Sequence, residues 1–158
     1  MTDIKFSAMP TEDAMKFWAG GEDAYGMKPE TQISDGEGVP CRHCLEDVGK
    51  DEPFLILAYK PFAEDQPYAE TGPIFLHAKS CQRHGETDQT PESFKKRPSY
   101  LMKGYYANDR IVYGTGRNVE PDGIEAYAKE LFSGNPDIAY IHVRSTLNNC
   151  YSARIDRA

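Results

Sequence analysis

Residues 139–156 read AYIHVRSTLNNCYSARID and carry the clearest alternation of apolar and polar residues in the chain. A period of two, found from Ala139 to Arg144 and again from Cys150 to Asp156, is typical of β-strands with one buried face. A loop with an odd number of residues, such as 146–148, would join them in a hairpin that keeps opposed residues on one face. Unless a bulge shifts the register, we expect one polar face made of Tyr140, His142, Arg144, Cys150, Ser152 and Arg154.

Other strands are predicted on the N-terminal side of this hairpin. Apolar runs bounded by turn residues indicate strands at 54–59, 74–78, 100–106 and 110–113. The first of these, FLILAY, is continuously apolar, which is how a strand buried on both faces reads.

Two helices complete the predicted fold. The main helix, over residues 121–132, is indicated by a core-facing stripe of Ile124, Ala128, Leu131 and Phe132. A short N-terminal helix is expected over residues 11–19, with Met15, Trp18 and Ala19 on one face. The predicted fold class is therefore α+β: one domain, 1–158, with a predominantly antiparallel sheet and a Gly-, Pro- and acid-rich surface connection at about 20–40.

The composition indicates which kinds of binding partner and which cellular compartment we expect. The net charge is −7, and the basic residues are scattered, whereas nucleic-acid binding needs clustered Lys and Arg. No stretch approaches a membrane span, and the N-terminus lacks the pattern of a signal peptide. We expect a cytoplasmic protein that binds neither nucleic acid nor membrane, with its four cysteines reduced, metal-bound or reactive.

A zinc site is the first functional hypothesis. Cys41 and Cys44 form a CxxC pair, and His77 and Cys81 form an HxxxC pair. Two close-spaced pairs of thiol and imidazole ligands suit tetrahedral zinc. Two alternatives stay open: the four side chains are ordinary structural residues, or the CxxC pair has a redox role, against which the acidic Glu46 and Asp47 count.

The polar face of the hairpin supports a second hypothesis, an enzyme. His142 and Cys150 on adjacent strands can pair as base and nucleophile, and Arg144 can hold a small anionic substrate. The alternative is a solvated strand face with its arginines in surface ion pairs. Gly114-Thr115-Gly116 is interpreted as a turn, because a lone GxG is a weak phosphate signal.

Three segments resemble the bacterial domain of unknown function 1203 family (DUF1203) over essentially the whole chain: PCRHCL at 40–45, PYAETGPIFLHAKSC at 67–81 and YIHVRSTLNNCYSARIDR at 140–157. The resemblance implies a one-domain bacterial protein and adds no reaction. It draws attention to Arg42, Tyr68 and Glu70 as candidate substrate-binding residues, beside His77, His142, Arg144 and Cys150 in the same motifs.

The two hypotheses lead to one preferred reading and one rival. The preferred reading is a small cytoplasmic protein with a zinc site of structural or binding role at Cys41, Cys44, His77 and Cys81. The rival is an enzyme acting on a small anionic ligand. Whether the chain is an enzyme, and which protein partner it has, the sequence does not say.

Overall fold

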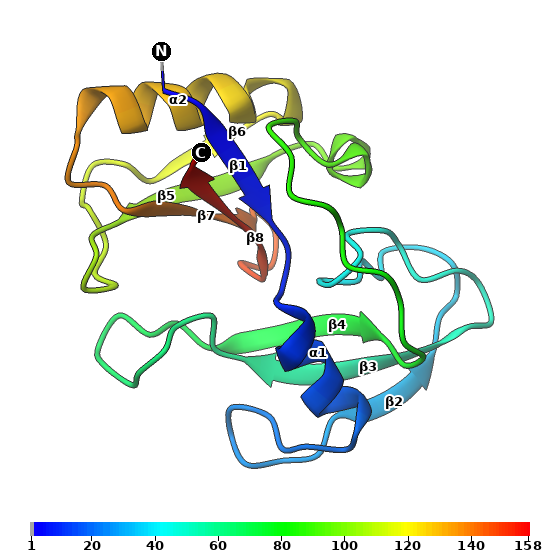
Figure 1. Ribbon diagram of the computed structural model, residues 1–158. Helices are drawn as coiled ribbons and strands as arrows, with labels where there is room; N and C mark the ends of the chain where they lie inside the picture. Colours follow the sequence, from blue (N-terminus) through cyan, green and yellow to red (C-terminus); the bar gives the residue numbers. More distant parts are fainter. Residues whose placement is uncertain (1) are drawn as a thin grey trace. The chain divides into compact units, whose positions relative to one another are not determined.

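The computed structural model describes residues 2–158 (Figure 1). This part of the chain contains eight β-strands, all paired antiparallel, two α-helices and two short 3-10 helices. The predicted α+β class, with one main helix and a short N-terminal helix, is confirmed. The chain forms two compact units: Ala8–His84, here the small-sheet unit, and the segment through Ser7 with Gly85–Ala158, here the large-sheet unit. The predicted assignment of residues 1–158 to one domain stays a prediction.

The large-sheet unit is built on a five-stranded sheet. Its strands, in spatial order, are β1 (Ile4–Ser7), β8 (Tyr151–Arg157), β7 (Tyr140–Ser145), β5 (Tyr100–Tyr105) and β6 (Arg117–Val119). Helix α2 (Ile124–Gly134) lies over one face of this sheet (Figure 1). A 3-10 turn at Glu92–Lys96 and another at Pro121–Gly123 complete the unit.

The predicted β7–β8 hairpin is confirmed. Its predicted polar face is wrong from Arg144 to the turn. His142 pairs with Arg154 as alternation requires, whereas Arg144 pairs with Tyr151, because the register shifts between Val143 and Arg144 and leaves Ser152 of β8 as the extra residue of a bulge. The extra residue of a bulge shifts the side-chain alternation of its strand. Tyr151, not Cys150, therefore joins the His142 side, where its ring lies 4.9 Å from the imidazole.

Helix α2 buries most of its predicted stripe. Ile124, Ala128 and Phe132 are buried, and Tyr127 is the fourth buried member. Leu131, predicted to be buried, is only half-buried. At about 100° per residue, Leu131 falls between Tyr127 and Ile124 on the buried side of α2, so its position around the helix does not explain its partial exposure.

The predicted strand at 110–113 is wrong. After the turn at 107–109, this segment makes only an isolated bridge, from Ile111 to Tyr105. Thr115 holds it as a turn, because its hydroxyl donates to the Val112 carbonyl and accepts from the Gly104 N–H. Pairing with β5 resumes only at β6, which the sequence analysis missed.

The small-sheet unit contains the sheet β2 (Glu30–Ile33), β3 (Pro53–Tyr59) and β4 (Gly72–His77). Strand β2 lies inside the predicted surface connection, and all four of its residues are exposed. Edge strands with polar residues give no apolar pattern to read from sequence.

Helix α1 (Thr11–Trp18) lies in the same unit, and the face that it buries is not the one that carries Met15. The buried residues are Ala14 and Phe17, and Met15 is 59% exposed. Tyr59 sets this orientation, because its ring lies edge-on against Phe17 and its hydroxyl donates to Asp13. Neither helix among residues 2–158 has the length and apolar character that a membrane crossing requires.

Candidate metal centre

A tight turn presents the first pair of candidate ligands, Cys41 and Cys44. The Cys41 N–H donates to the Glu46 carbonyl, and the Leu45 N–H donates back to the Cys41 carbonyl, each at 2.9 Å. Leu45 closes the turn in the left-handed region, at φ 59°, with its side chain buried. A non-glycine residue tolerates this conformation only where its surroundings fix it, so the apolar burial of Leu45 holds both thiols on one side of the turn.

Strand β4 delivers the second pair. The turn lies along β4 through a bridge between Cys41 and Phe75, in which the Arg42 N–H donates to the Phe75 carbonyl at 3.0 Å. His77 is the last residue of β4, and Cys81 follows four residues later. Cys44 and His77 are 33 residues apart in the sequence. The β3–β4 hairpin therefore brings them close together in space.

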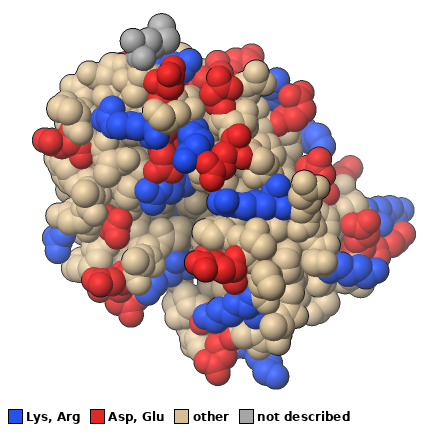
Figure 2. Space-filling view, viewed as in Figure 1, with Lys and Arg blue, Asp and Glu red and all other residues tan. Residues whose placement is uncertain are grey.

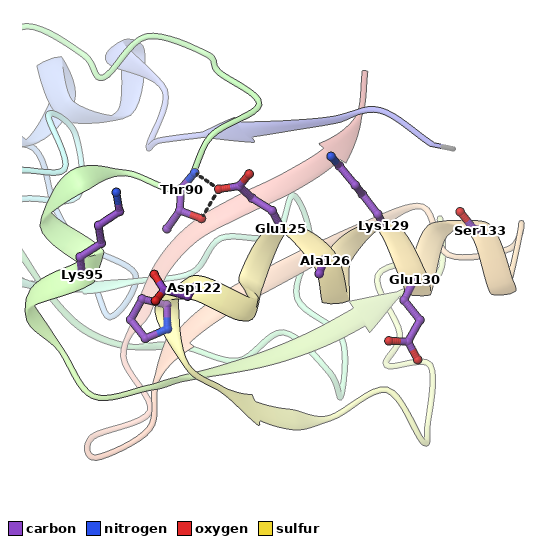
Figure 3. Close-up of a pocket in the computed structure, with 9 residues that line it drawn as sticks. Thr90, Lys95, Asp122, Glu125, Ala126, Lys129, Glu130 and Ser133 are labelled. Carbon is purple, nitrogen blue, oxygen red and sulfur yellow. Dashed lines mark hydrogen bonds between the residues drawn. The ribbon is translucent and has the colours of Figure 1, made fainter.

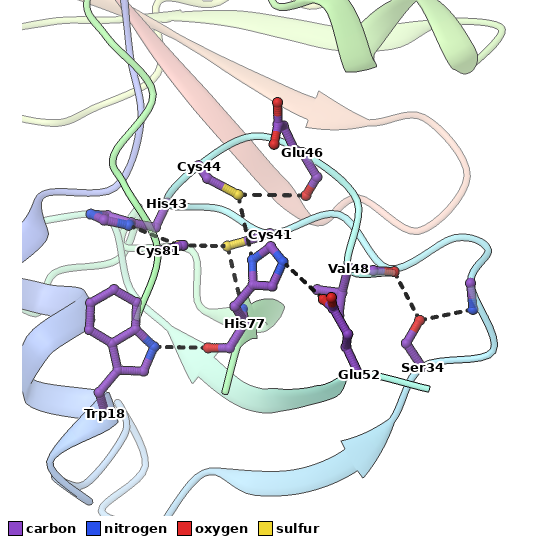
Figure 4. Close-up of polar contacts among 11 residues, drawn as sticks. Trp18, Ser34, Cys41, His43, Cys44, Glu46, Val48, Glu52, His77 and Cys81 are labelled. Atoms are coloured by element: carbon purple, nitrogen blue, oxygen red, sulfur yellow. Dashed lines mark hydrogen bonds and ion pairs between the residues drawn. The ribbon is translucent and has the colours of Figure 1, made fainter. Parts of the chain in front are cut away.

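The four predicted ligands come together (Figure 4). One donor atom from each of Cys41, Cys44, His77 and Cys81 lies within 4.8 Å of all the others. Cys41 Sγ is 3.8 Å from Cys81 Sγ, and Cys44 Sγ is 3.5 Å from His77 Nδ1. A tetrahedron with Zn–S near ~2.3 Å and Zn–N near ~2.05 Å puts two sulfurs about 3.8 Å apart and a sulfur and a nitrogen about 3.6 Å apart. The cluster can hold a metal ion.

The imidazole of His77 is oriented for ligation. Its Nδ1 faces the thiols, and its Nε2 lies 3.7 Å from a carboxylate oxygen of Glu52. Histidine ligands in metal sites commonly give their second nitrogen to a carboxylate, which fixes the ring. The backbone of His77 is also held, because Trp18 Nε1–H donates to its carbonyl at 2.8 Å.

The charges of the thiols fit a cation site. Hydrogen bonding from the Cys44 thiol, and then from backbone N–H groups, lowers the pKa of Cys41 to about 4, although burial opposes this. The hydrogen bond to Cys41 and burial raise the pKa of Cys44, and burial raises the pKa of Cys81 to about 12. Thiolates this close repel one another, so all three ionise together only beside a cation.

His43 lies directly behind the ligands. Its ring is buried, with Nδ1 3.2 Å from Cys81 Sγ and Nε2 2.9 Å from the Thr11 hydroxyl. Trp18 lies edge-on against it at 5.2 Å. Burial lowers the pKa of His43 and favours the neutral ring. The sequence marks His43 only as a spare ligand within CRHC; its partners come from α1 and have no sequence signal.

The second predicted cluster, the polar face of the β7–β8 hairpin, differs from its predicted arrangement. In the large-sheet unit, the buried His142 ring is surrounded by Tyr105, Tyr140 and Tyr151, with centroids 4.7–5.0 Å away. Burial, and then the charges of Arg144, Arg154 and Lys103, hold the pKa of His142 well below its usual range. Neutral histidine in an aromatic setting is therefore the form this sheet face favours.

The other predicted residues of that cluster have local partners. Arg144 Nε donates to the backbone and side-chain oxygens of Asn149, within the hairpin turn. Cys150 lies at the end of the turn, half-exposed, and its thiol donates to the Asn148 carbonyl. Arg154 is the residue that pairs with His142 across the strands, and the predicted role of His142 and Cys150 as base and nucleophile stays a prediction.

The candidate substrate-binding residues Arg42, Tyr68 and Glu70 belong to the small-sheet unit. Arg42 is buried within the cysteine turn, where its guanidinium donates to the Pro40 carbonyl at 3.4 Å. Tyr68 and Glu70 lie between β3 and β4, and the Glu70 N–H donates to the Tyr68 carbonyl. Their predicted role in substrate binding stays a prediction.

A pocket of about 690 Å³ runs along α2, in the large-sheet unit (Figure 3). Its wall includes Thr90, whose N–H and hydroxyl both donate to Glu125 Oε2. The lining mixes lysines with acidic residues, and none of the predicted site residues belongs to it. Basic and acidic side chains are likewise interspersed on the face shown in Figure 2.

The stretch of sequence that contains both ligand pairs also shows to which protein family the chain belongs. Residues 38–157 match the family model described as "Protein of unknown function (DUF1203)". The chain belongs to the DUF1203 family. No curated protein and no solved structure matches it. The match contains all four candidate ligands of this DUF1203 chain but not α1, which supplies Thr11 and Trp18.

Proposed function

We propose that this DUF1203 protein binds one zinc ion through Cys41, Cys44, His77 and Cys81, and that the ion has a structural role. The observation that carries the proposal is the agreement of the 3.8 Å sulfur–sulfur and 3.5 Å sulfur–nitrogen separations with a tetrahedral centre. Three soft thiolates and one imidazole favour zinc over magnesium or calcium, which prefer oxygen ligands.

A closed ligand set supports the structural role. Catalytic zinc keeps one coordination position for water or substrate, whereas four protein ligands fill a tetrahedral structural site. The ligands come from the cysteine turn, the end of β4 and the segment that follows it. Metal binding would therefore fasten these three parts of the small-sheet unit to one another.

Compartment and partners follow from the same chemistry. Three thiol ligands require a reducing compartment, so we place the protein in the cytoplasm. The net charge of −7 and the interspersed surface charges support a protein that binds neither nucleic acid nor membrane (Figure 2). For the rival enzyme hypothesis, cations surround His142, and Arg154, not Cys150, pairs with His142 across the strands.

Elemental analysis of protein purified without a metal-affinity tag tests the proposal. We expect one zinc per chain in the wild type and a large loss in Cys44→Ser and Cys81→Ser. Cys150→Ser is the matched control, because Cys150 lies outside the ligand cluster, and it should retain the full zinc content. A wild-type protein without zinc after zinc-supplemented expression, or an equal loss in all three variants, would contradict a site at these residues.

A further inference from the structure

The two ring nitrogens of His43 each have one polar neighbour, and the two neighbours differ in kind. Nδ1 lies 3.2 Å from Cys81 Sγ, and Nε2 lies 2.9 Å from the Thr11 hydroxyl. The ring cannot easily turn away from these contacts, because it is 1% exposed and the Trp18 ring packs against it at 5.2 Å. Its backbone is fixed as well, since the His43 carbonyl accepts the N–H of His84 at 2.9 Å.

The chemistry of a ligating cysteine decides which nitrogen carries the proton. A metal-bound thiolate only accepts hydrogen bonds, so Nδ1 of His43 must be the donor to Cys81. In the neutral ring Nε2 is then an acceptor, and the Thr11 hydroxyl, which can rotate to donate, satisfies it. Thr11 is free for this role because its side chain does not cap α1.

The same distances argue against His43 as a ligand. A nitrogen and a sulfur bound to one tetrahedral zinc lie about 3.6 Å apart, as the 3.5 Å between His77 Nδ1 and Cys44 Sγ illustrates. The 3.2 Å between His43 Nδ1 and Cys81 Sγ is shorter and suits an N–H···S hydrogen bond. His77 therefore fills the fourth ligand position, and His43 remains in the layer behind it.

We infer that His43 is a positioning residue of the metal centre, which donates a hydrogen bond to the Cys81 thiolate while Thr11 selects the required tautomer. This inference rests on the proposed metal site and adds how one of its ligands, Cys81, is fixed. Cys81 is half-exposed and follows the end of β4. The hydrogen bond orients its sulfur and withdraws electron density from it. Since Trp18 also holds the His77 carbonyl, α1 supports both histidines of the centre.

Cobalt substitution separates this role from a purely structural one. Co²⁺ replaces zinc in such sites, and its sulfur-to-cobalt charge-transfer band reports the electron density of the thiolates. Two variants remove the interaction: Thr11→Val keeps the shape of the side chain without its hydroxyl, and His43→Phe keeps an aromatic ring against Trp18. Thr11→Ser and His43→Asn are the matched controls, because each retains the needed donor.

Wild-type protein should bind one Co²⁺ with the strong visible absorption of a tetrahedral site. Thr11→Val and His43→Phe should shift the charge-transfer band to lower energy and weaken Co²⁺ affinity about 10- to 100-fold, the usual effect of losing an outer-layer partner. The two controls should restore the band position and most of the affinity. Thr11 is an exposed residue, so Thr11→Val tests the idea even where His43→Phe does not fold.

Three results would overturn the inference in distinguishable ways. A wild type that binds no Co²⁺ removes the proposed metal site and this inference together. A wild type that binds Co²⁺, with unchanged spectra and affinity in Thr11→Val and His43→Phe, removes the inference alone. Loss of the tetrahedral spectrum in His43→Phe, with its retention in His77→Phe, would make His43 the ligand instead.

Discussion

The two units of this DUF1203 protein hold their structure by different means. The large-sheet unit places α2 on a five-stranded sheet, and its fully buried residues include Ile4, Phe6, Met102, Ile124, Phe132, Ile141 and Ile155. The small-sheet unit has three strands, an eight-residue helix and long turns. Small cores stabilise a fold weakly, and metals commonly compensate. The largest fully buried side chains of the small-sheet unit are only Met9, Ile74 and Leu76, so we expect the proposed metal centre to matter most to this unit.

Removing the metal should have the largest effect and should affect the units unequally. Structural zinc contributes about 10–16 kcal/mol of binding free energy in small zinc-finger peptides. Under a zinc chelator, amides of the cysteine turn and of β4 should lose hydrogen-exchange protection, while those of β7 and β8 should keep theirs. Trp18, the single tryptophan, holds the His77 carbonyl, so its fluorescence should change at the same chelator concentration.

The chelation experiment has its own control. Zinc added back in excess should restore both the protection and the fluorescence. Equal loss of protection in the two units would break the comparison, because it would mean that they unfold as one body whatever the size of their cores.

Truncation of Phe132, a buried side chain of α2, tests how the large-sheet unit is stabilised. Phe132→Ala should lower the free energy of unfolding by about 3–5 kcal/mol, because the ring is buried and leaves a cavity. Zinc content should stay at the wild-type level, since Phe132 belongs to the large-sheet unit. Denaturation measured by far-ultraviolet circular dichroism, with zinc analysis of the same sample, checks both. Loss of zinc together with stability would contradict independent support of the units.

Acid should weaken the large-sheet unit through His142. Burial, aided by three nearby cations, lowers the folded-state pKa of His142, so below about pH 6.5 the unfolded chain binds a proton that the folded chain does not. The free energy of unfolding should then fall by up to about 1.4 kcal/mol per pH unit from pH 6.5 to 5.

His142→Phe isolates this contribution, because acid also displaces metal from thiolates. The variant places a non-titrating ring among three tyrosines and should show a shallower pH slope than the wild type over this range. Parallel slopes for the two proteins would show that His142 does not titrate on unfolding.

The elements that sequence predicted well are those whose pattern is regular. The alternation of β7 and β8 and the i, i+4 spacing of Ile124 and Ala128 depend only on backbone period. The cysteine and histidine spacing likewise predicted the four donors that the structure brings together. Strand β1 was missed because four residues give too short a pattern, and β2 because all its side chains are exposed.

What the sequence could not predict depends on contacts distant along the chain or on one irregular residue. The bulge beside Arg144 moves Tyr151 to the His142 side, although the residues themselves alternate without a break. The role of His43 depends on Thr11 and Trp18, which approach it only when α1 folds over the cysteine turn. The spacing of residues along the sequence gives no sign of such partners.

The smallest expected effect comes from truncation of the half-buried Leu131 in α2. A fully buried leucine truncated to alanine typically costs about 2–5 kcal/mol, but Leu131 is half-buried, while its neighbour Phe132 is buried. Part of the Leu131 side chain already contacts water, so its removal leaves a smaller cavity and exposes less new apolar surface. We therefore expect Leu131→Ala to cost about 1 kcal/mol, measured by urea denaturation beside Phe132→Ala. Glu130→Ala, at an exposed position of the same helix turn, is the control for helix propensity and should stay within about 0.5 kcal/mol. A loss for Leu131→Ala that matches Phe132→Ala would mean that the core of the large-sheet unit buries Leu131 as fully as Phe132, which would widen the difference between the two units.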